Sequence, residues 1–120
     1  MIAPDWFRED RLPHIYCTGC GNGTVLNCTL AAVEEMGWRQ DETAFISGIG
    51  CSSRAPGYIL ADSLHTTHGR ALAFATGVKM ARPDLNVVVF TGDGDLAAIG
   101  GYLFIHACRR NVDMTVICMY

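Results

Sequence analysis

The 120-residue sequence has no excess of positive charge, no long hydrophobic run, no internal repeat and no low-complexity segment. Nine Lys and Arg residues against twelve Asp and Glu residues give a formal net charge of −3. This charge excludes the basic surface typical of nucleic-acid-binding proteins. Charged residues interrupt the apolar residues at the N-terminus, which is predicted to be neither a signal peptide nor a membrane span. We therefore expect a single cytoplasmic domain over residues 1–120, with no nucleic-acid or membrane partner.

Cysteine is unusually frequent, with six residues. Because no export signal is visible, structural disulfides are not expected. Cysteines of a cytoplasmic protein that are not packed inside are more often metal ligands or catalytic residues. Cys28 and Cys108 lie in apolar helical stretches and Cys118 lies in a β-branched strand, so these three are predicted to be buried thiols. Cys17, Cys20 and Cys51 remain as candidates for chemistry.

Helical and extended patterns alternate along the chain. The expected helices cover residues 24–36 (ended by Gly37), 69–82 (ended by Pro83) and 96–110, and the expected strands cover residues 43–47, 86–91 and 112–120. Continuous β-branched residues in the second strand indicate burial on both faces. The succession predicts an α/β fold with a parallel sheet flanked by helices. Ligands of such sheets bind beyond the carboxyl ends of the strands, which favours the loops 48–57 and 92–95.

The loop TGDGD places two carboxylates among glycines, directly after a buried strand. Gly92, Gly94 and Ala97 satisfy the loose dinucleotide-binding pattern. Asp93 and Asp95, however, would repel a pyrophosphate unless a divalent cation lay between them. A carboxylate in a phosphate-binding loop suggests Mg²⁺ bridging the protein and a diphosphate. A solvated Asp-Gly turn is the plain alternative.

Three cysteines and two histidines form the second group of candidate ligands. Cys17 and Cys20 make a CxxC pair in a glycine-rich loop, and Cys51 follows in another. A redox site is one interpretation. A zinc site with His65 and His68 is another, although two residues between the histidines are fewer than the usual three to five. Three thiolates in flexible loops fit a 4Fe-4S cluster better, but such a cluster needs four ligands.

Four motifs in succession resemble the β subunits of 2-oxoacid:ferredoxin oxidoreductases. Their residue sequences are most similar to those of the 2-oxoglutarate synthases. They are YCTGCGNG, SGIGCSSR, LHTTHGRALAFATG and TGDGDLAAIGG, and the resemblance covers residues 12–119. It implies the N-terminal portion of a thiamine-diphosphate-binding fold that is truncated at the C-terminus, because Tyr120 stands where the motif's first Asn is usual. The second Asn and the fourth cluster cysteine would follow it.

The resemblance also implies roles for individual residues. Asp93 would be the Mg²⁺ ligand, and Cys17, Cys20 and Cys51 would be ligands of the 4Fe-4S cluster. The contacts implied for thiamine diphosphate are Ile49, Gly50, Cys51, Ser52, His68, Gly92, Gly94 and Asp95. Arg54, three residues after Cys51, could pair with a second carboxylate of the substrate, which favours 2-oxoglutarate. An ordinary surface arginine is the alternative.

The implied activity is the oxidative decarboxylation of a 2-oxoacid to acyl-CoA and CO₂, with electrons passing through the cluster to ferredoxin. Coenzyme A takes the acyl group, and the α subunit of the heterodimer supplies the activating glutamate, so the isolated chain is expected to be inactive. Two other hypotheses stay open. One is a non-catalytic zinc-binding or redox-sensing α/β domain using the CxxC pair, and the other is an inactive fragment of the family.

Overall fold

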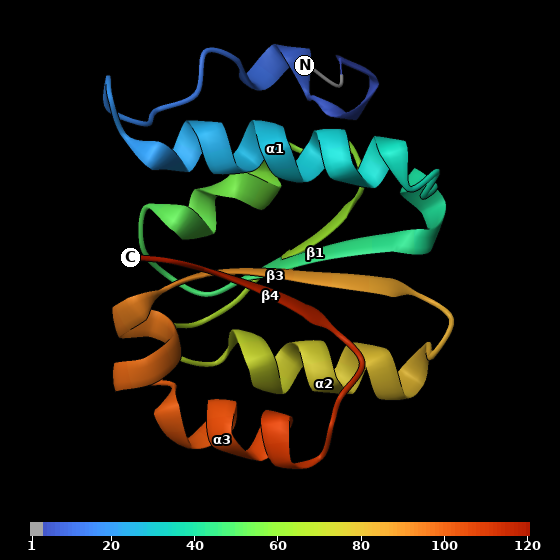
Figure 1. Ribbon diagram of the computed structural model, residues 1–120, viewed down its shortest axis with the longest axis vertical. Helices are drawn as coiled ribbons and strands as arrows, with labels where there is room; N and C mark the ends of the chain where they lie inside the picture. The colour runs from blue at the N-terminus through green and yellow to red at the C-terminus, as the bar shows by residue number, and fades with distance from the viewer. Residues whose placement is uncertain (1–3) are drawn as a thin grey trace.

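The computed structural model describes residues 4–120. Four parallel strands form one sheet in the order β2-β1-β3-β4. The helix α1 covers one face of this sheet, and α2 and α3 cover the other (Figure 1). The strands are β1 Thr43–Ser47, β2 Asp62–His65, β3 Asn86–Gly92 and β4 Thr115–Met119, and the helices are α1 Gly21–Glu35, α2 Ala71–Ala81 and α3 Gly101–Arg109. The predicted parallel α/β architecture is therefore confirmed.

The core lies on both faces of the central strand β3. Five consecutive residues from Val87 to Thr91 are buried, as its unbroken β-branched pattern predicted. Side chains alternate along a strand. Accordingly, Val88 and Phe90 pack on the α1 side, while Val87 and Val89 pack on the α2 side. Burial of each such side chain stabilises the fold by roughly 1.5–3 kcal/mol.

Helix ends follow the local chemistry. Gly37 has a φ of +68° just after α1, and its N–H donates to the Glu34 carbonyl at 3.0 Å. This confirms the predicted glycine cap, because the left-handed region favours glycine. The helix α2 ends at Ala81, two residues before Pro83. No helix among residues 4–120 is long and apolar enough to span a membrane.

The helix predicted over residues 96–110 is divided in two. A π-helical turn, Gly94–Ala98, precedes α3, and Gly100 stands at the junction. A Cβ atom at Gly100 would collide with the Asp95 carbonyl and approach the Leu96 carbonyl at 2.9 Å. The chain can turn this tightly only because this position has no side chain.

The strand β2 was not predicted. All four of its residues are exposed, and it pairs only with β1 at the edge of the sheet. An edge strand with no buried face has no alternating hydrophobic pattern. The segment Ser52–Tyr58, which was expected to be plain loop, forms a 3₁₀ helix.

The prediction that Cys28, Cys108 and Cys118 are buried is wrong, since all three are exposed. On α1 the buried residues include Leu26 and Leu30. Cys28 lies midway between them and therefore faces away from the core at 3.6 residues per turn. Cys108 follows the one buried residue of α3. Cys118 lies in β4, which has a strand neighbour only in β3 among the described residues.

Replacement of Gly100 by Ala tests the junction between the π-helical turn and α3. Because the colliding atoms are backbone atoms, we expect Gly100→Ala to lower the free energy of unfolding by about 1–3 kcal/mol. Gly101→Ala is the matched control, since its Cβ would meet nothing within 4 Å. It should be neutral or stabilising. Urea unfolding measures both, and equal stability of the two variants would contradict the close packing.

Candidate functional site

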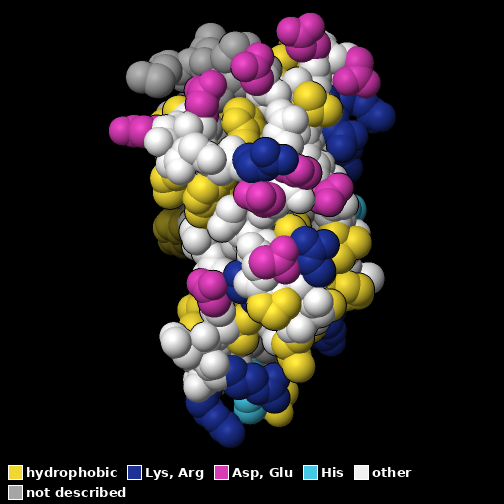
Figure 2. Space-filling model, turned by 90° about the vertical axis from the view of Figure 1, so that its right-hand side faces the viewer, with side chains coloured by type: hydrophobic (Ala, Val, Ile, Leu, Met, Phe, Trp, Pro, Cys, Tyr) yellow, Lys and Arg dark blue, Asp and Glu magenta, His cyan; other side chains and the backbone are white. Residues whose placement is uncertain are grey.

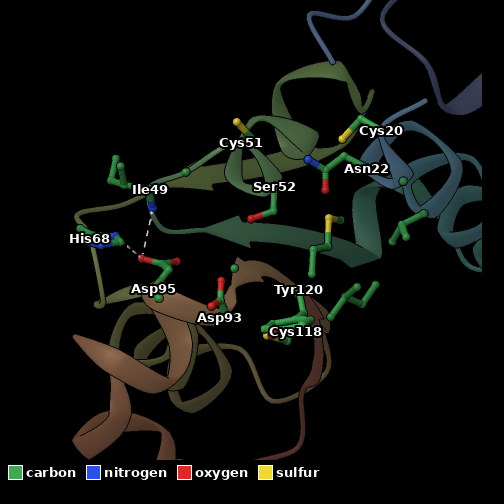
Figure 3. A pocket seen from close by; sticks show the side chains of 17 residues that line it. Cys20, Asn22, Ile49, Cys51, Ser52, His68, Asp93, Asp95, Cys118 and Tyr120 are labelled. Carbon is green, nitrogen blue, oxygen red and sulfur yellow. Dashed lines mark hydrogen bonds and ion pairs between the residues drawn. The ribbon is translucent and has the colours of Figure 1, made fainter. Parts of the chain in front are cut away.

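A pocket of about 620 Å³ lies beyond the carboxyl ends of β1, β3 and β4 (Figure 3). It is lined by the loops after β1 and β3, by the end of β4 and by the first turn of α1. The connection after β1 packs on the α1 side, whereas the connection after β3 packs on the α2 side. The two connections diverge, and a crevice opens between them, as expected where strand order reverses. We call this the main pocket.

The loop after β1 bends sharply into the main pocket. Gly50 has a φ of +133°, a conformation that only glycine adopts readily. Its carbonyl then accepts the Ser53 N–H at 3.1 Å, which begins the 3₁₀ helix. Ile49, 43% exposed, and the buried Ser52 both line the pocket. The predicted loop 48–57 therefore does reach the crevice.

The two aspartates of the glycine loop have opposite surroundings. Asp93 is exposed and lines the main pocket, with its carboxylate directed into it (Figure 3). Asp95 is 4% exposed, and its side chain turns towards the protein interior. Asp95 also lines the pocket, but protein donors occupy both of its carboxylate oxygens. Among the described residues that line the pocket, Asp93 is therefore the carboxylate placed to bind a cation.

The Asp95 carboxylate accepts four hydrogen bonds. Its Oδ1 accepts from the Gly69 N–H at 2.6 Å, from His68 Nδ1 at 2.8 Å and from the Ile49 N–H at 3.3 Å. Its Oδ2 accepts from Thr91 Oγ1 at 2.8 Å. Burial raises the pKa of this carboxyl, but these four donors together hold the pKa below its ordinary value. Asp95 is therefore ionised at neutral pH.

The two histidines lie in different places. His68 lines the main pocket, whereas His65 contacts Ser47 through Nδ1 at 3.0 Å. Ser47 already donates its hydroxyl proton to the Ser53 carbonyl at 2.9 Å. It therefore accepts from His65, whose Nδ1 must carry the proton. The structure does not bring the two histidines together as a ligand pair.

Arg54 lines a second pocket, of about 410 Å³, rather than the main one. Arg11 and His65 line this second pocket as well, and no carboxylate side chain does. Ser53 also borders it and has a buried hydroxyl without a hydrogen-bond partner among the described residues. The second pocket is thus rich in donors and cations, which suits an anionic group.

The candidate cluster cysteines are only partly gathered. Cys20 and Cys51 line the main pocket, whereas Cys17 is exposed outside it. Burial is the main cause that raises the pKa of Tyr16, and nearby Tyr58, Cys51 and Cys20 raise it further. The two thiols thus lie near one phenol. Among residues 4–120, however, no three His, Cys, Asp or Glu side chains are grouped as a metal site.

Sequence reasoning did not assign Cys118 or Asn22 to the site, and it named Tyr120 only as standing at the motif's first Asn position. Cys118, Tyr120 and Asn22 all line the main pocket. Burial raises the pKa of the Cys118 thiol even though it reaches solvent, and the nearby Asp93 carboxylate adds to this effect. The predicted parallel sheet could have indicated the residues at the end of β4, because the carboxyl end of β4 lies beside that of β3.

The main pocket fits a diphosphate with Mg²⁺. Its volume lies within the usual range for cofactor sites, and the Asp93 carboxylate offers the oxygen ligand that Mg²⁺ prefers. A Cβ atom at Gly94 would meet no atom within 4 Å, so open space adjoins the backbone at this point of the loop. Asp93 with Gly92 and Gly94 would hold the metal and the diphosphate.

Comparisons with known proteins agree with this geometry. The family described as "Thiamine pyrophosphate enzyme, C-terminal TPP binding domain" matches residues 48–120. The 2-oxoglutarate synthase subunit KorB of Methanocaldococcus jannaschii is 68% identical over 117 residues, which are 98% of this chain and 43% of that protein. The 2-oxoglutarate oxidoreductase subunit KorB of Mycobacterium tuberculosis is 50% identical over 85% of the chain and 27% of its own length.

A solved structure shows the same fold. It is the 2-oxoglutarate:ferredoxin oxidoreductase from Magnetococcus marinus with 2-oxoglutarate, coenzyme A and succinyl-CoA bound. The TM-score is 0.93 with 47% sequence identity, over 99% of this chain and 40% of that one. The chain thus spans less than half the length of the first curated relatives it matches. It belongs to the thiamine pyrophosphate enzymes and, among them, to the β-subunit family of the 2-oxoacid:ferredoxin oxidoreductases.

Proposed function

We propose that the chain forms the thiamine-diphosphate-binding part of a 2-oxoacid:ferredoxin oxidoreductase. The observation that carries this proposal is the exposed Asp93 carboxylate in a 620 Å³ pocket at the point where the strand connections diverge. The reaction is the oxidative decarboxylation of a 2-oxoacid to acyl-CoA and CO₂, with ferredoxin as electron acceptor. Bound thiamine diphosphate supplies the nucleophile and the electron sink for this chemistry.

The residues that line the main pocket are proposed to have different roles in binding the cofactor. Asp93 binds Mg²⁺, and Gly92 and Gly94 let the diphosphate approach the backbone. Ile49, Gly50, Cys51, Ser52 and His68, which also line the pocket, would contact the rings of the cofactor. The activating glutamate is proposed to come from the α subunit.

The second pocket supports a substrate with two carboxylates. Its cations include Arg54, whose guanidinium can bind a carboxylate through two hydrogen bonds. Ser52 and Ser53 are adjacent in sequence and line the main and second pockets respectively. A 2-oxoacid could therefore react in the main pocket and place its distal carboxylate at Arg54. This favours 2-oxoglutarate, the substrate in the names of the first listed relatives.

The 4Fe-4S cluster is proposed to bind to Cys17, Cys20 and Cys51. All three thiols are exposed, and two of them line one pocket. Because the described residues do not gather the three into one metal group, the loop with Cys17 must move towards Cys51. A fourth ligand must also come from elsewhere.

The competing hypotheses find less support. A zinc-binding domain would use the same cysteines, and the described residues hold no gathered group of three ligands for either metal site. The cluster is favoured over zinc by the relatives, which are named 2-oxoacid:ferredoxin oxidoreductases. A dinucleotide-binding domain would place the exposed Asp93 against a pyrophosphate without a bridging cation, which is repulsive.

Replacement of Asp93 by Asn tests the Mg²⁺ site. We expect Asp93→Asn to lower the affinity for thiamine diphosphate in the presence of Mg²⁺ about tenfold or more, or about 1.4 kcal/mol, because a charged ligand of the cation is lost. Isothermal titration calorimetry of the chain, with Mg²⁺ and with EDTA, measures this. The exposed Asp62, which lies outside the main pocket, provides the control Asp62→Asn. If the wild-type chain bound thiamine diphosphate with the same affinity in Mg²⁺ and in EDTA, the proposed Mg²⁺ site would be wrong.

Replacement of Arg54 by Gln tests substrate choice in the oxidoreductase assembled with its partner subunits. We expect Arg54→Gln to reduce kcat/KM for 2-oxoglutarate about tenfold or more. The value for pyruvate, which has no second carboxylate, should stay within about twofold. Arg82→Gln is the control, because Arg82 is exposed and paired with Asp84. An equal decrease of kcat/KM for both substrates would show that Arg54 does not bind the distal carboxylate.

Cysteine variants test the cluster. Anaerobic reconstitution of the chain with iron and sulfide should give broad brown absorbance and about four irons per chain. We expect Cys20→Ser to lose most of this iron, and Cys28→Ser to retain it, since Cys28 is equally exposed but lies on the outer face of α1. A colourless wild-type chain with tightly bound zinc would refute the cluster.

A further inference from the structure

The Asp95 carboxylate connects three segments that are far apart in the sequence. Its four donors come from the loop after β1, from the loop before α2 and from the end of β3 itself. The carboxylate also lies against Gly48, where a Cβ atom would overlap it. Asp95 borders the main pocket, but its side chain is only 2% exposed, and its four hydrogen bonds are all with the protein.

These contacts fix the proton on the His68 ring. A carboxylate oxygen with three donors at Oδ1 can only accept, so the Nδ1 atom of His68 must carry a proton. The other ring nitrogen, Nε2, is then left for a ligand. The His68 side chain is 46% exposed and lines the main pocket, so the ring contacts Asp95 and still reaches the pocket (Figure 3).

The same carboxylate also holds the loop after β1, next to His68. The Ile49 N–H donates to it from the loop after β1, and the Ile49 side chain lines the main pocket. Imidazole rings turn readily about χ2, and a loop that contains Gly50 at positive φ is conformationally permissive. One buried acceptor therefore restrains two groups that would otherwise be free to reorient.

We propose that Asp95 is a positioning residue, which holds the His68 imidazole in the Nδ1–H form with Nε2 available to the main pocket and keeps Ile49 in place beside it. It acts through these two residues and not by touching the diphosphate. The proposal rests on the proposed function, because His68 matters to catalysis only if it contacts the bound cofactor.

Nitrogen NMR of the histidine rings tests the first step without any cofactor. The His68 signals are assigned by their loss in His68→Ala. In the wild-type chain we expect a single form with Nδ1 protonated, and in Asp95→Ala a mixture in which Nε2 carries the proton in part. An unchanged His68 signal in Asp95→Ala would overturn the proposal.

Asp95→Asn keeps the proposal testable if Asp95→Ala does not fold. Two backbone N–H groups point at Oδ1, so the amide must place its oxygen there and its NH₂ towards Thr91. His68 should therefore keep the Nδ1–H form in this variant. A shift to the Nε2–H form would overturn the proposal.

A double-mutant cycle tests the second step. Affinity for thiamine diphosphate with Mg²⁺ is measured for the wild-type chain, Asp95→Ala, His68→Ala and the double variant. We expect Asp95→Ala alone to weaken binding about tenfold, and to weaken it clearly less when His68 is already absent. Additive losses would show that Asp95 does not act through His68. A wild-type chain that binds no thiamine diphosphate would refute the proposed function, while the NMR result would still decide the Asp95–His68 link.

Discussion

The parallel pairing of β1 with β3 is the constraint on which the rest of the structure depends. The two strands run in register from Thr43 beside Asn86 to Ser47 beside Phe90, and helices bury both faces of β3. Parallel pairing brings both carboxyl ends to one edge of the sheet. Because the chain leaves β1 on one face and β3 on the other, these loops diverge and leave the main pocket between them.

The loop after β3 uses two chemically identical side chains for two purposes. One residue, Gly94, separates Asp93 from Asp95, and the chain enters a π-helical turn there. One carboxylate therefore faces the pocket and the other the interior. The exposed one is available to a cation. The buried one is stable as an anion because four protein donors replace its water. The sequence pattern predicted a cation at this loop and the resemblance assigned it to Asp93, but neither showed that the Asp95 side chain turns inward to protein donors.

Strands with apolar residues that pack at least partly against the core could be predicted from the sequence, whereas the fully exposed strand β2 could not. The strand β1 was predicted at its observed bounds, and β3 to within one residue, since both have continuous apolar or β-branched residues that only a buried strand explains. The strand β2 has four exposed residues and was missed. The prediction that Cys28, Cys108 and Cys118 are buried failed for a related reason. Hydrophobic neighbours in the sequence do not show which face of a helix or edge strand a thiol occupies.

By itself, the sequence determined the alternation of helices and strands, the parallel sheet and the two loops that form the site. Local periodicity and turn chemistry encode these features directly. Only the tertiary structure decided which residues meet in those loops. It placed Arg54 in a second pocket, separated His65 from His68, and turned Asp95 inward to His68 and Ile49. Such contacts join residues tens of positions apart, and their geometry depends on how whole elements pack, which no local pattern contains.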